Sequence, residues 1–497
     1  MMKIKACLFL IILIIILGSE NSPIYSQLIK NQSIEIPLNT KNQNSDFKLF
    51  PLKNGGFILQ ERTEPSFGKN PAIWITEKYS NDMVLLWSKQ IEIPNDLNFD
   101  QDFFTEHTLY QNFTVPSSSK IKLLRIDIET GIFDSIEGDL VGIQDIFDMK
   151  VVENHAFFSG KFQGRAVVMS LSFFDGTVKA LTGLYSNHID LVEIEANEEK
   201  KELHIYTKNR YKNKCELQLR RYDKEGNPLN ISYLSNETRK MPFNGRNHNM
   251  EDGRAMVIGN YARFCDNYSQ GIYVNILDEN VVEKSDFLDF SQFKNFFNYL
   301  NPKRQQKVKE KLSKRKEAGK AINFNYSMLV HKLYHFNNQL VMVAEIFYTE
   351  PRNPATMPMY ISSRNYSPYN YRFTHTIICG FDMEGNKLWD NCLPMKALNS
   401  FYLNEQVQLS ELDNKLILAY PENGKIKTQV IEEDKTLKEK EEFEVVAKNN
   451  GFGDGDSSAG LSAWYGQNFL HWGIKNGDFE NTEINKVLFI NKLTYKL

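Results

Sequence analysis

Carboxylates are the residues of this chain that come nearest to a catalytic set. Hydrolysis of a glycosidic bond uses two facing carboxyl groups. Glu61, Glu345 and Glu350 lie on or just after predicted strands, although a chain with 62 acidic residues contains many such placements. These residues leave one hypothesis open, a carbohydrate-active hydrolase or lyase whose carboxylates line a central channel.

Other reactive patterns are missing from the sequence. It contains no GxSxG nucleophile elbow, no HExxH helix, no Walker loop and no GxGxxG after a strand. His331 and His335 are four residues apart, but they fall in a predicted strand and turn, where they do not share a face. We therefore expect a protein without catalytic residues, cofactor or metal site.

Basic residues are concentrated in an insertion predicted at 291–323. Four apolar residues recur at the spacing of one helix face and predict a first helix there: Phe290, Phe293, Phe297 and Leu300. Asn301 and Pro302 suit the start of a second helix. Nine basic and two acidic residues follow within 303–320, a net charge of +7 in a chain whose total is −3.

A second insertion, at 350–372, is rich in Tyr, Pro, Asn and Arg. Tyrosine offers a large and stiff contact area, and arginine adds planar hydrogen-bond donors. The two insertions together supply the candidate binding residues: Lys303, Arg304, Lys307, Lys311, Lys314, Arg315, Tyr360, Arg364, Tyr366, Tyr369, Tyr371 and Arg372.

The elements that must position these residues form a repeat. Apolar strands end at polar turns, often Asp-x-x-Gly, and a second strand follows each turn. The first strands of these hairpins are spaced by about fifty residues, with one double interval between Asn275 and Cys379 that contains both insertions. A second hairpin precedes most of them, so each unit has four strands. The pattern predicts an all-β protein, a β-propeller of about eight and possibly seven blades, with two stacked β-sandwiches as the alternative.

The two ends of the repeat predict how the ring closes. The segment 32–37, QSIEIP, resembles KQIEIP at 89–94, which is the fourth strand of the first unit. The last unit ends near Leu497 with little room for its own fourth strand. We therefore expect the N-terminal copy to complete the last blade and remove an open sheet edge.

Residues 1–26 are typical of a secretion signal, with an apolar run at 6–17 after two lysines. An uncleaved membrane anchor is the alternative. We expect 27–497 to form one exported propeller domain, in the periplasm or at the cell surface. Export permits disulfides. Cys379 and Cys392 lie on the two arms of one predicted hairpin, in an offset register that leaves their pairing open, and Cys215 and Cys265 have no predicted partner.

Several segments resemble a group of exported proteins from Bacteroidota: SQGIYV, FxxFFNYL, MVAEIFYTE and YRFTHTIICGFDMEGNKLWDN. The resemblance implies a location in the cell envelope and indicates no particular activity.

The two insertions connect strands in a way that predicts one shared surface. In an up-and-down blade, the connection between units and the connection between the second and third strands emerge on the same side. We therefore expect both insertions at the rim around the sixth unit, where the protein would bind an envelope protein or a glycan without catalysis. The net charge of −3 argues against nucleic acid as the partner, and we expect no transmembrane segment after signal cleavage. A purely structural repeat protein, without pocket or partner, is the third possibility.

Overall fold

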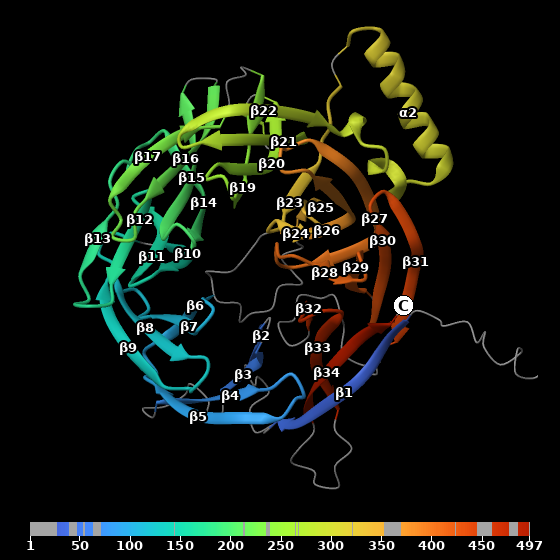
Figure 1. Cartoon of the computed structure of the whole chain (residues 1–497). Helices are drawn as coiled ribbons and strands as arrows, with labels where there is room; N and C mark the ends of the chain where they lie inside the picture. Colours follow the sequence, from blue (N-terminus) through green and yellow to red (C-terminus); the bar gives the residue numbers. More distant parts are fainter. Residues whose placement is uncertain are drawn as a thin grey trace, which may run out of the picture.

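The computed structural model describes residues 27–38, 47–52, 55–62, 71–143, 145–211, 214–234, 239–263, 265–266, 268–320, 322–351, 369–422, 424–444, 460–476 and 486–496. Within these residues, eight antiparallel sheets follow one another around a central axis (Figure 1). The chain is an eight-bladed β-propeller, which confirms the predicted fold and decides the blade number.

The first four blades each contain four strands in chain order, from the innermost to the outermost. Their strands are β2 (Phe47–Leu52), β3 (Gly56–Arg62), β4 (Ala72–Tyr79) and β5 (Leu85–Ile93) in blade 1; β6 (Asn98–Phe104), β7 (Thr108–Thr114), β8 (Lys120–Asp127) and β9 (Phe133–Asp139) in blade 2; β10 (Asp145–Val152), β11 (His155–Phe162), β12 (Arg165–Ser172) and β13 (Val178–Ala180) in blade 3; and β14 (Ile189–Asn197), β15 (Glu202–Tyr211), β16 (Lys214–Tyr222) and β17 (Pro228–Tyr233) in blade 4.

Blades 5 and 6 have an innermost strand that is divided into two short pieces, both paired with the same second strand. The remaining strands are β18 (Lys240–Pro242), β19 (Arg246–Asn249), β20 (Ala255–Arg263), β21 (Ser269–Asp278) and β22 (Val281–Asp289) in blade 5; β23 (Ser327–Val330), β24 (Tyr334–Phe336), β25 (Gln339–Pro351), β26 (Tyr369–Phe381) and β27 (Lys387–Ser400) in blade 6; β28 (Gln408–Leu412), β29 (Lys415–Glu422), β30 (Lys425–Glu432) and β31 (Lys435–Glu444) in blade 7; and β32 (Gly460–Ala463), β33 (Asn468–Asn476) and β34 (Lys486–Lys496) in blade 8.

The N-terminal strand closes the ring as the sequence predicts. Strand β1 (Gln27–Leu38) pairs antiparallel with β34 and forms the outermost strand of blade 8. Ile34 lies opposite Ile490, and Ile36 lies opposite Leu488. Figure 1 shows the two ends of the described chain side by side in this blade. Strand β1 thus covers an edge that another chain could otherwise pair with.

The predicted turn chemistry is present in the hairpins. In the turn between β16 and β17, the Asp223 carboxylate accepts a hydrogen bond from the backbone N–H of Asn227 at 2.8 Å. Gly226 in this turn has a φ of +85°, a conformation that glycine adopts without a steric penalty. The turn between β26 and β27 repeats this arrangement with Asp382 and Gly385, whose φ is +77°.

Apolar side chains fill the interfaces between blades. The cluster between blades 1 and 2, for example, packs Ile58 and Trp74 against Leu109 and Phe113. Similar clusters lie between each pair of neighbouring blades, including between blades 8 and 1. Because a single sheet has two apolar faces, each blade depends on both neighbours for burial.

The helical insertion differs in part from the prediction. The phenylalanine segment forms two short 3₁₀ turns, η1 (Phe290–Gln292) and η2 (Phe296–Tyr299), instead of one helix. Tertiary contacts decide this: the Asp390 carboxylate of β27 accepts the backbone N–H groups of Lys294 and Asn295 at 3.1 and 2.7 Å. Helix α2 (Pro302–Glu317) begins where predicted, and the side chain of its N-cap Asn301 accepts the N–H of Arg304 at 3.0 Å.

The cysteines pair differently from the possibility left open by the sequence. Cys215 of β16 forms a disulfide with Cys265, which follows β20, and this bond joins blades 4 and 5. Cys379 and Cys392 are buried and form no disulfide among the described residues. They do not pair because Cys379 lies opposite Asp390, while Cys392 lies opposite Ile377.

Candidate binding sites

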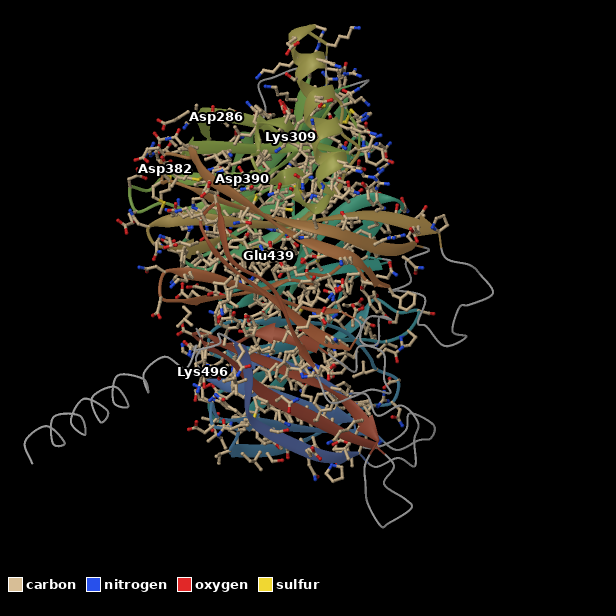
Figure 2. All side chains as sticks on the ribbon, turned by 90° about the vertical axis from the view of Figure 1, so that its right-hand side faces the viewer. Asp286, Lys309, Asp382, Asp390, Glu439 and Lys496 are labelled. Atoms are coloured by element: carbon tan, nitrogen blue, oxygen red, sulfur yellow. A yellow bond between two sulfur atoms is a disulfide. The ribbon has the colours of Figure 1, made fainter. Side chains whose placement is uncertain are left out.

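Helix α2 stands outside the ring beside blades 5 and 6 (Figure 1). Its contact with the body of the protein is narrow: Val308 and Leu312 pack against the apolar cluster between these blades. Gln305 adds a hydrogen bond to the carbonyl of Leu300 at 2.7 Å. Figure 2 shows Lys309 on the helix, which extends beyond the outer strand that carries Asp390. Most of the helix surface is therefore open to solvent.

The predicted basic residues of α2 are all exposed, and four of them line one groove. This groove has a volume of about 480 Å³ and is lined by Lys307, Glu310, Lys311, Lys314, Arg315, Ala318 and Lys320. Lys303 and Arg304 lie in the first helical turn, outside the lining of the groove. Glu310 accepts a hydrogen bond from Gln306 at 3.0 Å. The groove thus gathers five cationic side chains around one carboxylate.

The charge pattern of α2 is unfavourable for an isolated helix. Lys303, Lys307 and Lys311 follow one another at i, i+4 spacing, and Arg315 continues the row. Like charges at this spacing destabilise a helix by about 0.2–0.5 kcal/mol per pair. The first turn contains no acidic residue, although the helix dipole favours one there. Only the basic last turn complements the dipole.

The structure places three of the residues predicted in the Tyr/Pro-rich insertion. Tyr360, Arg364 and Tyr366 lie outside the described residues. Tyr369, Tyr371 and Arg372 belong to β26. The side chain of Tyr369 is exposed, and the ring of Tyr371 packs on Phe347 with centroids 5.6 Å apart. Arg372 forms an ion pair with Glu350 of β25 at 3.3 Å, so Glu350 is a surface partner rather than part of an acidic pair.

An aromatic network joins the base of the helical insertion to blade 6. The ring of Tyr299 in η2 stacks on His375 of β26, with centroids 3.9 Å apart. The hydroxyl of Tyr299 lies 3.1 Å from that of Tyr326. Burial raises the pKa of both tyrosines, and Tyr348 at the end of β25 contributes to the shift. Tyr348 lies three residues before Pro351, the last described residue ahead of the gap at 352–368.

A second candidate site is a cavity of about 720 Å³ on the axis of the ring. Its wall comes mainly from the innermost strands of blades 2 to 5, which face the axis in Figure 1, with further residues before β24 and β28. Its charged and imidazole side chains are Asp102, Lys150, Glu193, Glu195, Glu198, Glu199, His204, Arg246, His248, Lys332 and Glu405.

Several of these charges are already paired. Arg246 forms an ion pair with Glu193 and donates hydrogen bonds to the carbonyl of Val330 at 3.0 and 3.3 Å. Lys150 binds both carboxylate oxygens of Asp148, at 2.7 and 2.6 Å. The carboxyl of Glu195 is different, because burial, opposed by Arg246, raises its pKa to about 7.

The sequence also singled out Glu345 and His331, and the structure joins them beside this cavity. Both are fully buried, and Nε2 of His331 lies 2.9 Å from Oε1 of Glu345. The same oxygen accepts the backbone N–H groups of Gln406 and Val407 at 2.8 and 2.7 Å. Burial lowers the pKa of His331, but Glu345 and Glu405 outweigh it and raise that pKa. This pair anchors the segment between blades 6 and 7.

Sequence reasoning missed the individual cavity residues. Glu193, Glu195 and Asn197 alternate along one strand, which places them on one face. That alternation was visible in the sequence, but the facing residues of β19 come from another blade. Glu61, the remaining sequence candidate, lies on β3, where burial, together with Glu77, raises its pKa. It is not part of the cavity wall.

Two features are absent from the described residues. No group of three or more His, Cys, Asp or Glu side chains there is arranged to hold a metal ion. No helix within the same residues is long and apolar enough to span a bilayer.

Comparisons with known proteins give matches among solved structures. No family model matches the chain, and no curated protein matches it. An oligogalacturonate lyase in complex with manganese is similar over 94% of this chain and 98% of its own, with 11% identity and a TM-score of 0.37. The β-propeller domain of the trilobed protease from Pyrococcus furiosus is similar over 80% of this chain and 93% of its own, with 8% identity and a TM-score of 0.35. Prolyl oligopeptidase B from Galerina marginata is similar over 90% of this chain and 55% of its own, with 8% identity and a TM-score of 0.40. Likeness at this level carries no argument about activity.

Proposed function

We propose that this propeller is an exported, non-catalytic binding module of the cell envelope, and that the basic groove of α2 binds an acidic surface of a partner protein. The observation that carries the proposal is the convergence of Lys307, Lys311, Lys314 and Arg315 on one exposed groove of about 480 Å³. An anionic partner would relieve the repulsion along this row of cations.

Exposed tyrosines on blade 6 support a protein as the partner. Tyr348 and Tyr369 are exposed at the end of blade 6, with 42% and 44% of their surface accessible. Tyrosine and arginine are enriched at protein interfaces, where a stiff ring gives contact area at low entropic cost.

The alternative of a carbohydrate-active enzyme finds support in the number of carboxyl groups around the axial cavity and in the raised pKa of Glu195, which suits a general acid. Of these groups, Glu193 is ion-paired with Arg246, and Asp102 with Lys48 at 3.3 Å. A hydrolytic pair needs a protonated acid and an ionised carboxylate that is free to act as base or nucleophile. The cavity therefore gives this alternative less support than α2 gives to binding.

The test measures binding of fluorescein-labelled poly-L-glutamate by fluorescence anisotropy. In the quadruple variant Lys307→Gln, Lys311→Gln, Lys314→Gln and Arg315→Gln, we expect affinity at least tenfold below wild type. Helix α2 retains its cap and its two apolar contacts in this variant, so the fold is preserved.

A matched control removes four exposed lysines from the outer strands of blades 8, 1, 3 and 7: Lys30, Lys89, Lys179 and Lys435. Both variants change the net charge equally, and we expect the control to bind like wild type. Equal loss in the two variants would show that only overall charge matters and would refute the proposal. Tighter binding of polygalacturonate than of poly-L-glutamate would assign the groove to an acidic glycan instead.

A further inference from the structure

The interface between blades 4 and 5 is polar where it reaches the axial cavity. Glu195 of β14 lies directly opposite His204 of β15, so both side chains project from the same face of blade 4. Asn247 of β19 faces them from blade 5, and its backbone N–H acts on the Glu195 carboxyl. All three residues line the cavity.

Each of these residues presents a buried atom for which the described residues supply no hydrogen-bond partner. Within the described part of the chain, no hydrogen bond reaches Oε2 of Glu195, Nδ1 of His204 or Oδ1 of Asn247. The side chain of His204 is only 2% exposed. Buried polar atoms are nearly always satisfied by protein, water or ligand, so three on one wall require an explanation.

The three atoms share one chemical character, because each can accept a hydrogen bond. Nε2 of His204 lies 3.2 Å from the Glu202 carboxylate, which makes Nε2 the donor and leaves Nδ1 as an acceptor. The amide nitrogen of Asn247 donates to Asn249 at 3.2 Å, which leaves its oxygen to accept. These three atoms therefore lack a hydrogen-bond donor, although the Tyr206 hydroxyl, which acts on Glu195, and Nε of Arg221, which acts on His204, are also buried without a partner among the described residues.

The charges around the cavity favour a cation. Arg246 is compensated by Glu193, and Lys150 is compensated by Asp148. Glu198 and Glu199 add exposed carboxylates to the rim, and Glu199 accepts a hydrogen bond only from the neutral amide of Asn249 among the described residues. Lys332 is the opposing cation at the cavity wall, so negative charge exceeds positive charge there.

We propose that this cavity binds a small organic cation whose primary ammonium group donates hydrogen bonds to Glu195, His204 and Asn247. An ammonium group has three donors and no acceptor, which matches three acceptors that lack a donor. A volume of about 720 Å³ lies in the range of small-molecule sites. A water molecule fits less well, because it brings two donors and also needs donors in return.

The experiment is isothermal titration calorimetry of the full chain with spermidine, with glucose as a neutral comparison. We expect spermidine to bind wild type, and Glu195→Gln to weaken binding at least tenfold while preserving the shape of the cavity. Asn247→Asp should strengthen binding severalfold, a gain that misfolding cannot produce. Glu137→Gln, on the outer strand β9, should bind like wild type.

Three results would overturn the proposal. Absence of spermidine binding to wild type would leave the acceptors to buried water. Equal binding by wild type and Glu195→Gln would place the cation at the exposed glutamates of the rim. Binding of glucose in preference to spermidine would assign the cavity to a neutral polyol.

Discussion

Glu195→Gln should stabilise the protein, and by an amount that depends on pH. The carboxyl of Glu195 has its pKa raised to about 7 by burial, against an ordinary value of 4.5. A raised carboxyl pKa means that the folded state holds the proton more tightly than the unfolded state. Its contribution to stability is therefore complete below pH 4.5 and is lost as the pH rises towards 7.

The size of the effect follows from this difference. At pH 8 the free energy of unfolding of the wild type should be about 3 kcal/mol below that of a variant with a neutral side chain at this position, at about 1.4 kcal/mol per pKa unit. This figure is an upper bound, because part of the Glu195 side chain faces the cavity while Oε2 is buried. The loss should shrink to about 1 kcal/mol at pH 5 and vanish near pH 4.

Urea denaturation at pH 4, 5 and 8 measures these differences between wild type and variant. Glu137→Gln, in an exposed position on β9, is the control and should change stability by less than about 0.5 kcal/mol at each pH. An unfolding free energy of Glu195→Gln equal to or below that of wild type at pH 8 would refute the reasoning. It would mean that Arg246 and its neighbours hold Glu195 as a stabilised anion.

Three further predictions concern the ring. The disulfide between Cys215 and Cys265 closes a loop of 50 residues, so its removal should lower the free energy of unfolding by about 4 kcal/mol by the chain-entropy relation. A reductant should therefore lower the thermal midpoint of the wild type but not that of Cys215→Ser. Deleting 27–38 should expose the edge of β34 and cause aggregation, which light scattering would detect, whereas deleting only 1–26 should leave a monomer. A soluble and stable 27–38 deletion would contradict the role of β1 in closing the ring. His375 and His471 are fully buried, and burial lowers the pKa of each to about 3. Each should therefore lower the free energy of unfolding by about 2.5 kcal/mol as the pH falls from 7 to 4.5, because these histidines take up protons below pH 6.5 only in the unfolded chain. Replacing either residue by Gln should reduce this loss of stability in acid, and an unchanged loss would contradict the prediction.

The sequence was sufficient for the architecture because periodicity is a local property. Turns such as that at Gly226 and alternating strands repeat along the chain, and four strands cannot bury both faces of their sheet without neighbours. The likeness of 32–37 to 89–94 was enough to place β1 in blade 8. The start of α2 was also predictable, since Asn301 and Pro302 form a local cap.

Features that depend on contacts between blades could not be predicted. Phe290 and Phe297 have helical spacing, yet both are buried in 3₁₀ turns, because Asp390 from a strand far along the chain binds the backbone between those turns. The disulfide joins two blades, so hairpin register gave no information about it. Glu195 lies on a visible pattern, but its surroundings include Arg246 from the next blade, and only the folded ring brings them together.

Hydrogen–deuterium exchange with and without bound poly-L-glutamate tests the central claim most directly, since it reports where the partner binds. We expect slowed exchange in peptides that cover α2, Pro302–Glu317, and unchanged exchange in the outer strands of blades 1 and 3. Protection confined to other parts of the ring, with α2 exchanging as fast as in the free protein, would contradict a binding role for this helix.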